Sequence, residues 1–209
     1  MADEYEPVSG ADADVVGLLA FSALAVMTRL AKDGDQSPTI AAHIEHARMS
    51  KRAFEIFEEL EVWSAHRGVD LPAVASEYSG LYDDLDARTR PTTWAERSTK
   101  TYVTVGIIGD MLAEISRRHE LFGVADGLWD LGQGEWVRTH LGPRILADQQ
   151  LAARLSLWAR RVAGEVIGLV RATLFTHPDL AMTPEAMDEI AEFVTTRHGE
   201  RMKELHLKP

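Results

Sequence analysis

An apolar stretch near the start of the chain, VVGLLAFSALAVMT at residues 15–28, limits what the protein can fold into. Its fourteen residues carry no charge, and Arg29 ends the run. A helix needs roughly 20 apolar residues to cross a bilayer. A secretory signal opens with basic residues, whereas acidic residues precede this stretch. Because a helix that is apolar on nearly every side is typical of the centre of a helical protein, we expect a buried core helix in a cytoplasmic protein.

The composition excludes several classes of protein. The 209 residues suffice for one hydrophobic core, and we expect a single domain at residues 14–209 after a disordered acidic leader at residues 1–13. Asp and Glu outnumber Lys and Arg by 33 to 22, and the net charge of -11 repels nucleic acid and anionic lipid. Neither DNA nor a membrane is therefore an expected partner. The absence of cysteine excludes disulfides, thiolate metal sites, iron–sulfur clusters and cysteine nucleophiles.

Start and stop signals predict helices along almost the whole chain. Ser37 precedes a proline in the manner of a capping residue, and Gly68 is placed to end the helix that follows. Thr93–Glu96 has the spacing of a capping box, Thr183 with the next proline starts the last helix, and Gly142–Pro143 is expected to break the fourth. The predicted helices cover residues 15–30, 39–66, 93–115, 124–145, 148–175 and 184–202, with an irregular segment at 70–91.

The segment TYVTVGIIGD, residues 101–110, is ambiguous between helix and strand. Its β-branched residues favour a strand, and Gly106 and Gly109 each cost a helix about 1 kcal/mol. We nevertheless predict a helix, because the helical pattern continues through Ile115 and a lone strand would leave its backbone groups without partners. The glycines are then explained by a close approach of two helices.

The length and the helical content also fit a repressor of the TetR type. Such proteins begin with a basic helix-turn-helix of about 45 residues, which inserts one helix into the major groove of DNA. Here that region holds an acidic leader and a wholly apolar helix. The sequence therefore disfavours this alternative.

Three segments carry a resemblance to a known family: Arg29–Leu30–Ala31 after the apolar helix, Tyr102–Val103 with Gly106–Ile107 and Asp110, and ARLSLWARRVAGEVIG at residues 153–168. With them the chain resembles the ferritin-like superfamily over most of residues 14–175. Within the superfamily it is similar to a bacterial branch that includes MiaE, a di-iron hydroxylase that modifies a tRNA base. The resemblance implies an all-α fold, a ferritin-like four-helix bundle with additional C-terminal helices.

The sequence departs from the di-iron pattern of that superfamily. Such a site takes a Glu from each of two helices and a Glu-x-x-His unit from each of the other two, because two iron ions need bridging carboxylates and imidazoles. Ala23 stands where the first helix would carry its Glu, and Gln133 where the fourth would carry a His. The second helix has Glu45 and His46 side by side instead of Glu-x-x-His. The resemblance therefore implies a degenerate di-iron site.

Two carboxylates of the pattern remain, Asp110 on the third helix and Glu135 on the fourth. We interpret both as vestigial metal-ligand candidates, and Glu45 with His46 as a further candidate pair. The competing interpretation is structural, because carboxylates on an amphipathic helix commonly face solvent or pair with a nearby arginine. The sequence contains no readable nucleophile or phosphate-binding motif that would indicate another class of enzyme.

Two functions remain open. In the first, the protein is a non-catalytic binding or assembly module without a cofactor, a homodimer with a further protein or small-molecule partner. Its interior then holds Ala23, Val26, Val105 and Ile108 where iron would sit. In the alternative it is a MiaE-like di-iron hydroxylase, in which iron is held by Asp110, Glu135, Glu45 and His46. A tRNA substrate, expected under the alternative alone, is disfavoured by the net charge of -11.

Overall fold

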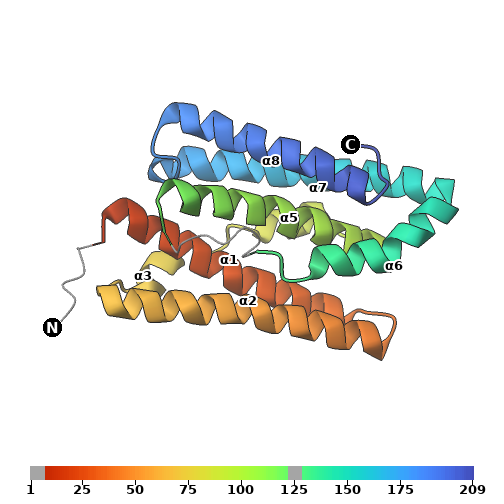
Figure 1. Cartoon of the computed structure of the whole chain (residues 1–209), viewed down its shortest axis with the longest axis horizontal. Helices are drawn as coiled ribbons and strands as arrows, with labels where there is room; N and C mark the ends of the chain where they lie inside the picture. Colours follow the sequence, from red (N-terminus) through yellow and green to blue (C-terminus); the bar gives the residue numbers. More distant parts are fainter. Residues whose placement is uncertain (1–7, 122–128) are drawn as a thin grey trace.

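The computed structural model describes residues 8–121 and 129–209, and within these ranges every regular element is a helix. The elements are α1 (Gly10–Asp35), α2 (Ile40–Arg67), α3 (Leu71–Ser76), α4 (Asp83–Arg88), α5 (Trp94–Arg118), α6 (Gln133–Ala147), α7 (Gln149–Thr176), a 3-10 turn η1 (Pro178–Leu180) and α8 (Pro184–Glu204) (Figure 1). The predicted all-α class is confirmed.

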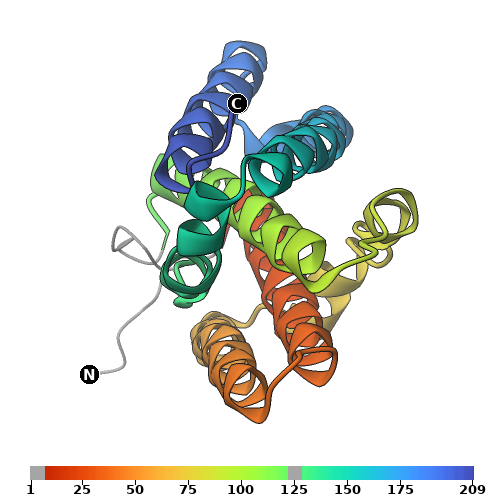
Figure 2. The ribbon, with the colours of Figure 1, turned by 90° about the vertical axis from the view of Figure 1, so that its right-hand side faces the viewer.

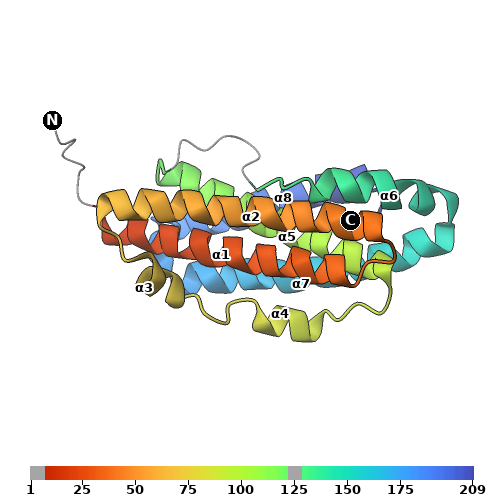
Figure 3. The ribbon, with the colours of Figure 1, turned by 90° about the horizontal axis from the view of Figure 1, so that it is seen from below.

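The long helices run lengthwise along the molecule (Figures 1 and 3). α1 and α2 make an antiparallel hairpin, and the segment that carries α3 and α4 then returns along the length of the molecule (Figure 3). α5 therefore runs in the same direction as α2 and antiparallel to α1 (Figure 1). α5 lies at the centre, in contact with α1, α6, α7 and α8 (Figure 2). α7 and α8 are the additional C-terminal helices that the resemblance implied.

α1 is the buried core helix that its composition predicts. Val15, Leu18, Leu19, Ala23 and Leu30 are each at most 1% exposed. Among the described residues α1 alone is long and apolar enough to cross a membrane, yet 56% of its most apolar window is buried inside the protein. The neighbouring helices α2, α3 and α5 supply this cover.

The helix ends follow the sequence signals with three differences. The capping box of Thr93 and Glu96 and the left-handed Gly68 after α2 are confirmed. The residue that caps α2 is Thr39 rather than Ser37, because the Thr39 side chain accepts a hydrogen bond from the Ala42 amide. α1 begins at Gly10, where the side chain of Ser9 caps it, so residues 10–13 are helical instead of belonging to a disordered leader. Residues 1–7 lie outside the described residues.

The third difference concerns α6. The predicted break at Gly142–Pro143 was wrong, since α6 continues to Ala147 with Pro143 inside it. A helical proline removes one backbone donor and bends the helix without always ending it, and α6 turns toward α7 near its C-terminal end (Figure 1). Part of the helix predicted at 124–145 lies outside the described residues, and α6 itself begins at Gln133.

The ambiguous segment 101–110 is helical, as predicted, but its glycines have another explanation than helix–helix approach. A Cβ on Gly106 would overlap the guanidinium of Arg201, which reaches over from α8. A Cβ on Gly109 would lie 2.8 Å from the Cβ of Trp129, in the segment before α6. Side chains therefore occupy the space that the two glycines leave open.

The backbone of α3 comes close to α1 at Gly17. A Cβ there would lie 2.5 Å from the carbonyl oxygen of Val74 and 2.7 Å from its carbon, both in α3. We predict that Gly17→Ala lowers the free energy of unfolding by about 1–3 kcal/mol, because the backbone of α3 has to move away. Urea unfolding followed by far-ultraviolet circular dichroism measures this change.

Gly164 is the matched control, since it lies inside α7 with nothing within 4 Å of an added Cβ. Gly164→Ala should raise the free energy of unfolding by roughly 0.5–1 kcal/mol through helix propensity alone. Equal effects of the two substitutions would contradict the proposed role of Gly17.

Candidate functional site

A pocket of about 440 Å³ lies between α1 and α5, on the side that α4 covers. Its volume is within the range of roughly 300–1,000 Å³ that small-molecule sites have. The lining comes from three separate parts of the chain: the C-terminal half of α1, the segment around α4, and the N-terminal half of α5. The pocket therefore exists only because the chain returns along the bundle between α2 and α5.

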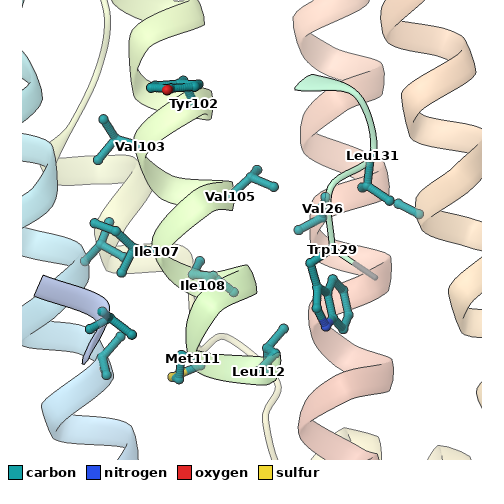
Figure 4. Packing of buried hydrophobic residues seen from close by; sticks show 14 of the residues in the cluster. Val26, Tyr102, Val103, Val105, Ile107, Ile108, Met111, Leu112, Trp129 and Leu131 are labelled. Atoms are coloured by element: carbon teal, nitrogen blue, oxygen red, sulfur yellow. The ribbon is translucent and has the colours of Figure 1, made fainter. Parts of the chain in front are cut away.

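The pocket is apolar at one end. Phe21 and Leu24 line it there from α1. Val26 on α1 faces Val105 and Ile108 on α5, so that these three side chains meet between the two helices (Figure 4). They are at most 5% exposed. This end can take up an apolar group of a ligand.

The other end is charged. Because α1 and α5 are antiparallel, the charged residues that follow the apolar part of α1 lie beside the charged residues that precede the apolar part of α5. Asp33, 1% exposed, accepts hydrogen bonds from Arg97 Nη1 at 3.1 Å and from the hydroxyl of Thr101. On the α4 side, the carboxylate of Asp86 accepts hydrogen bonds from Lys100 Nζ at 2.8 Å and from Arg29. Two clusters of ion-paired side chains, one around Asp33 and one around Asp86, thus close this end of the pocket.

Positive charge predominates in the pocket. Its lining contains five cationic side chains, Arg29, Lys32, Arg90, Arg97 and Lys100, and three carboxylates, Asp33, Asp83 and Asp86. The chain as a whole carries a net charge of -11. An excess of cations concentrated in one partly apolar pocket of an acidic protein favours an anionic group there.

Lys100 is the most perturbed of these groups. Its residue is 2% exposed, and burial, together with the positive charges of Arg29 and Arg97, lowers its pKa from 10.5 to about 7, against the opposing charge of Asp33. Burial likewise lowers the pKa of Arg29. The Lys100 amine is therefore poised to change its charge near neutral pH.

Asp110, the ligand candidate on α5, faces α8 and not the interior between α1 and α5. Arg201 Nη2 donates to its carboxylate at 2.7 Å, and both side chains are more than four-fifths buried. The Arg201 side chain reaches Asp110 across the face that Gly106 leaves open. The structure thus shows Asp110 as one partner of an ion pair between α5 and α8.

Glu135 and Glu45 lie at the surface, and each has a partner on its own helix. Arg138 donates to Glu135, as does Thr139, and these hydrogen bonds lower the pKa of the Glu135 carboxyl group. Arg48 donates to Glu45 in the same way. Both carboxylates border a groove between α2 and α6, which Asp110 does not border.

His46 is buried among aromatic rings. Its ring centroid lies 4.7 Å from that of Trp136 and 5.5 Å from that of Trp94, and its Nδ1 is 2.8 Å from the carbonyl oxygen of Ala42. Gln133, which replaces an expected histidine, accepts from the Leu131 amide and so orders the start of α6. His46 is thus packed against two tryptophan rings, and Gln133 is hydrogen-bonded to the backbone before α6.

The donor set does not fit a di-iron centre. Asp110 is ion-paired toward α8, Glu135 and Glu45 border another groove, and Ala23 offers no donor. Within residues 8–121 and 129–209, no three His, Asp or Glu side chains form a group that could hold a metal ion. The candidates named from the sequence are therefore not brought together at one point in the part of the chain that the structure describes.

Sequence reasoning missed the charged end of the pocket. The spacing of the residues did indicate that Asp33 and Thr101 lie on buried helix faces. Asp33 follows the buried Val26 by seven residues, and Thr101 precedes the buried Ile108 by seven. Residues seven apart share one helix face. Polar groups that continue a buried face must find partners inside the protein, although the sequence alone does not tell which.

Two comparisons with known proteins bear on the chain. Residues 6–182 match the family model described as "Ferritin-like domain, actinomycetes". A search of curated proteins found no match.

The lowered pKa of Lys100 predicts a pH-dependent stability. From its folded pKa of about 7 up to its ordinary 10.5, the unfolded chain holds a proton at Lys100 that the folded chain releases. The free energy of unfolding should therefore rise with pH in this window, by up to about 1.4 kcal/mol per pH unit from this group. Urea unfolding between pH ~7 and ~9 measures the slope, which Lys100→Met should reduce.

Lys203→Met on α8 is the matched control, because Lys203 is exposed. It should leave the slope unchanged. If Lys100→Met and Lys203→Met gave the same slope, the perturbation of Lys100 would be disproved.

Proposed function

Since this chain belongs to the actinomycete family of ferritin-like domains, we propose that it is a non-catalytic module that binds an anionic, amphiphilic small molecule in the pocket between α1 and α5. Membership of the family confirms the ferritin-like fold expected from the sequence. The finer assignment, a cytoplasmic MiaE-like protein with a degenerate di-iron site that no longer holds metal, is part of the proposal.

The observation that carries the proposal is the change of polarity along the pocket. A carboxylate placed near Arg97 and Lys100 gains from the cation excess, while an alkyl or aromatic group lies against Val26, Val105 and Ile108. Burial of each methylene group contributes about 0.8 kcal/mol. The pocket thus combines one charged anchor with an apolar compartment, as small-molecule sites commonly do.

The placement of the former ligand positions supports the absence of metal chemistry. Arg201 neutralises Asp110, and Glu135 is 73% exposed in its side chain. Binding iron at Asp110 would require breaking an ion pair between two largely buried groups, which is costly. The alternative, a di-iron hydroxylase, would need Asp110 to move to the groove that Glu45 and Glu135 border.

One test of the proposal is the metal content. Protein produced with iron and manganese supplied should contain fewer than about 0.1 metal equivalents per chain by elemental analysis, because the usual set of four carboxylates and two histidines is incomplete. The absorption of oxo-bridged iron should be absent from its spectrum. About two equivalents of iron per chain would refute the proposal and favour the hydroxylase.

Another test is ligand binding, with decanoate as the probe in isothermal titration calorimetry. Decanoate should bind at one site per chain, and each methylene removed should weaken binding about fourfold. Lys100→Met should weaken it by roughly tenfold, since one charge partner is lost. Affinity should also fall as pH rises above about 7, where Lys100 loses its proton.

Two controls locate the site. Lys203→Met, the same change at the surface of α8, should leave decanoate binding unaltered, and decanol should bind the wild type and Lys100→Met equally because it carries no charge. If decanoate did not bind, or if Lys203→Met weakened it as much as Lys100→Met, the pocket would not be the site.

A further inference from the structure

The outer face of α2 is unusually apolar for a surface. α2 packs against α1 through one side, which includes Ala42, Met49, Ala53 and Leu60. On the opposite side Ile40, Ile44, Phe54 and Val62 are 75%, 45%, 38% and 57% exposed. Because a helix turns by about 100° per residue, these four positions lie on one stripe. α2 forms the lower edge of the molecule, and no described element lies beyond this stripe (Figures 1 and 2).

The same stripe carries two charges in a symmetric arrangement. Lys51 lies three residues before Phe54, and Glu58 lies four residues after it. When a second copy of α2 is laid antiparallel to the first and centred between Phe54 and Glu55, position 51 of one copy lies opposite position 58 of the other. In the same way 47 lies opposite 62, and 44 opposite 65. Lysine then meets glutamate, and the exposed Ala47 and Ile44 meet Val62 and Ala65. The stripe is therefore complementary to itself when it is turned end to end.

The charges on and beside the stripe follow the same rule. Arg48 and Lys51 make the stretch before Phe54 basic, whereas the stretch after it is acidic through Glu55, Glu58 and Glu61. An antiparallel second helix would set each basic stretch against an acidic one, while a parallel one would oppose like charges. This self-complementarity is the requirement of an interface with twofold symmetry.

We propose that this stripe is the interface of a homodimer, in which α2 of a second copy packs antiparallel across a twofold axis between Phe54 and Glu55. The two Phe54 rings meet at the centre, each beside Phe57 of its own chain, with which it stacks at 5.7 Å. Lys51, which contacts Glu55 of its own helix, also reaches Glu58 of the second copy. α2 has 28 residues and is about 42 Å long, so the contact extends over most of the molecule.

Charge reversal in the full-length protein tests the proposal, with sedimentation equilibrium as the measurement. The wild type should be a dimer. Lys51→Glu and Glu58→Lys should each raise the dissociation constant about tenfold or more, because each places like charges together twice in a symmetric interface. The combined variant carries both changes and restores opposite charges across the interface. It should return to within about threefold of the wild type.

The matched controls make the same charge changes on α8, where Lys203 and Glu192 are exposed. Lys203→Glu and Glu192→Lys should leave the dissociation constant unchanged. Phe54→Ala should weaken the dimer about tenfold, and Phe175→Ala, at a side chain that is 82% exposed on α7, should not. Circular dichroism should show that all variants remain folded.

Three results would overturn the proposal. One is a wild type that stays monomeric over the whole concentration range. Another is a dimer that neither Lys51→Glu nor Glu58→Lys weakens, which would place the interface elsewhere. The third is a combined variant as weak as its single parents, which would show that the two residues do not face each other. None of these results depends on metal content or on ligand binding.

Discussion

Burial of most of the apolar stretch of α1 is the constraint on which the rest of the structure depends. A helix with so little polar surface is stable in water only when other helices cover it. α2, α3 and α5 provide that cover, and the backbone of α3 comes close enough at Val74 to require a glycine at position 17. The return of the chain through α3 and α4 then places α5 antiparallel to α1. The bundle is thus organised around its first helix.

The same burial creates the charged end of the pocket. α1 stays inside the protein past the end of its apolar run, and it takes Arg29 and Asp33 with it. A buried charge is costly unless it is paired and hydrogen-bonded, and α5 and the α4 segment supply the partners in Arg97, Thr101 and Asp86. The polarity of the pocket is therefore a consequence of how the first helix is buried.

The proposed ligand pocket and the proposed dimer interface lie on different faces of the bundle. The ligand pocket uses the side of α1 and α5 that α4 covers. The dimer interface uses the side of α2 that points away from α1. Neither surface depends on iron. Asp110 and His46 contribute to stability through Arg201 and the tryptophan rings.

The sequence by itself determined most of the fold. The apolar run predicted a buried first helix, and the caps at Thr93, Gly68 and Thr183 marked helix ends that the structure confirms. These features are local, since they depend on residues a few positions apart. The break expected at Pro143 was wrong because a proline bends a helix as readily as it ends one.

Only the tertiary structure decided which polar groups meet. Asp33 and Arg97 are 64 residues apart in the chain, and Asp110 and Arg201 are 91 apart. No local pattern relates such residues, because their distance depends on how the helices pack. Spacing placed Asp110 and Glu135 on a family pattern, whereas packing turned them toward separate partners and assembled a pocket from residues that the sequence had not singled out.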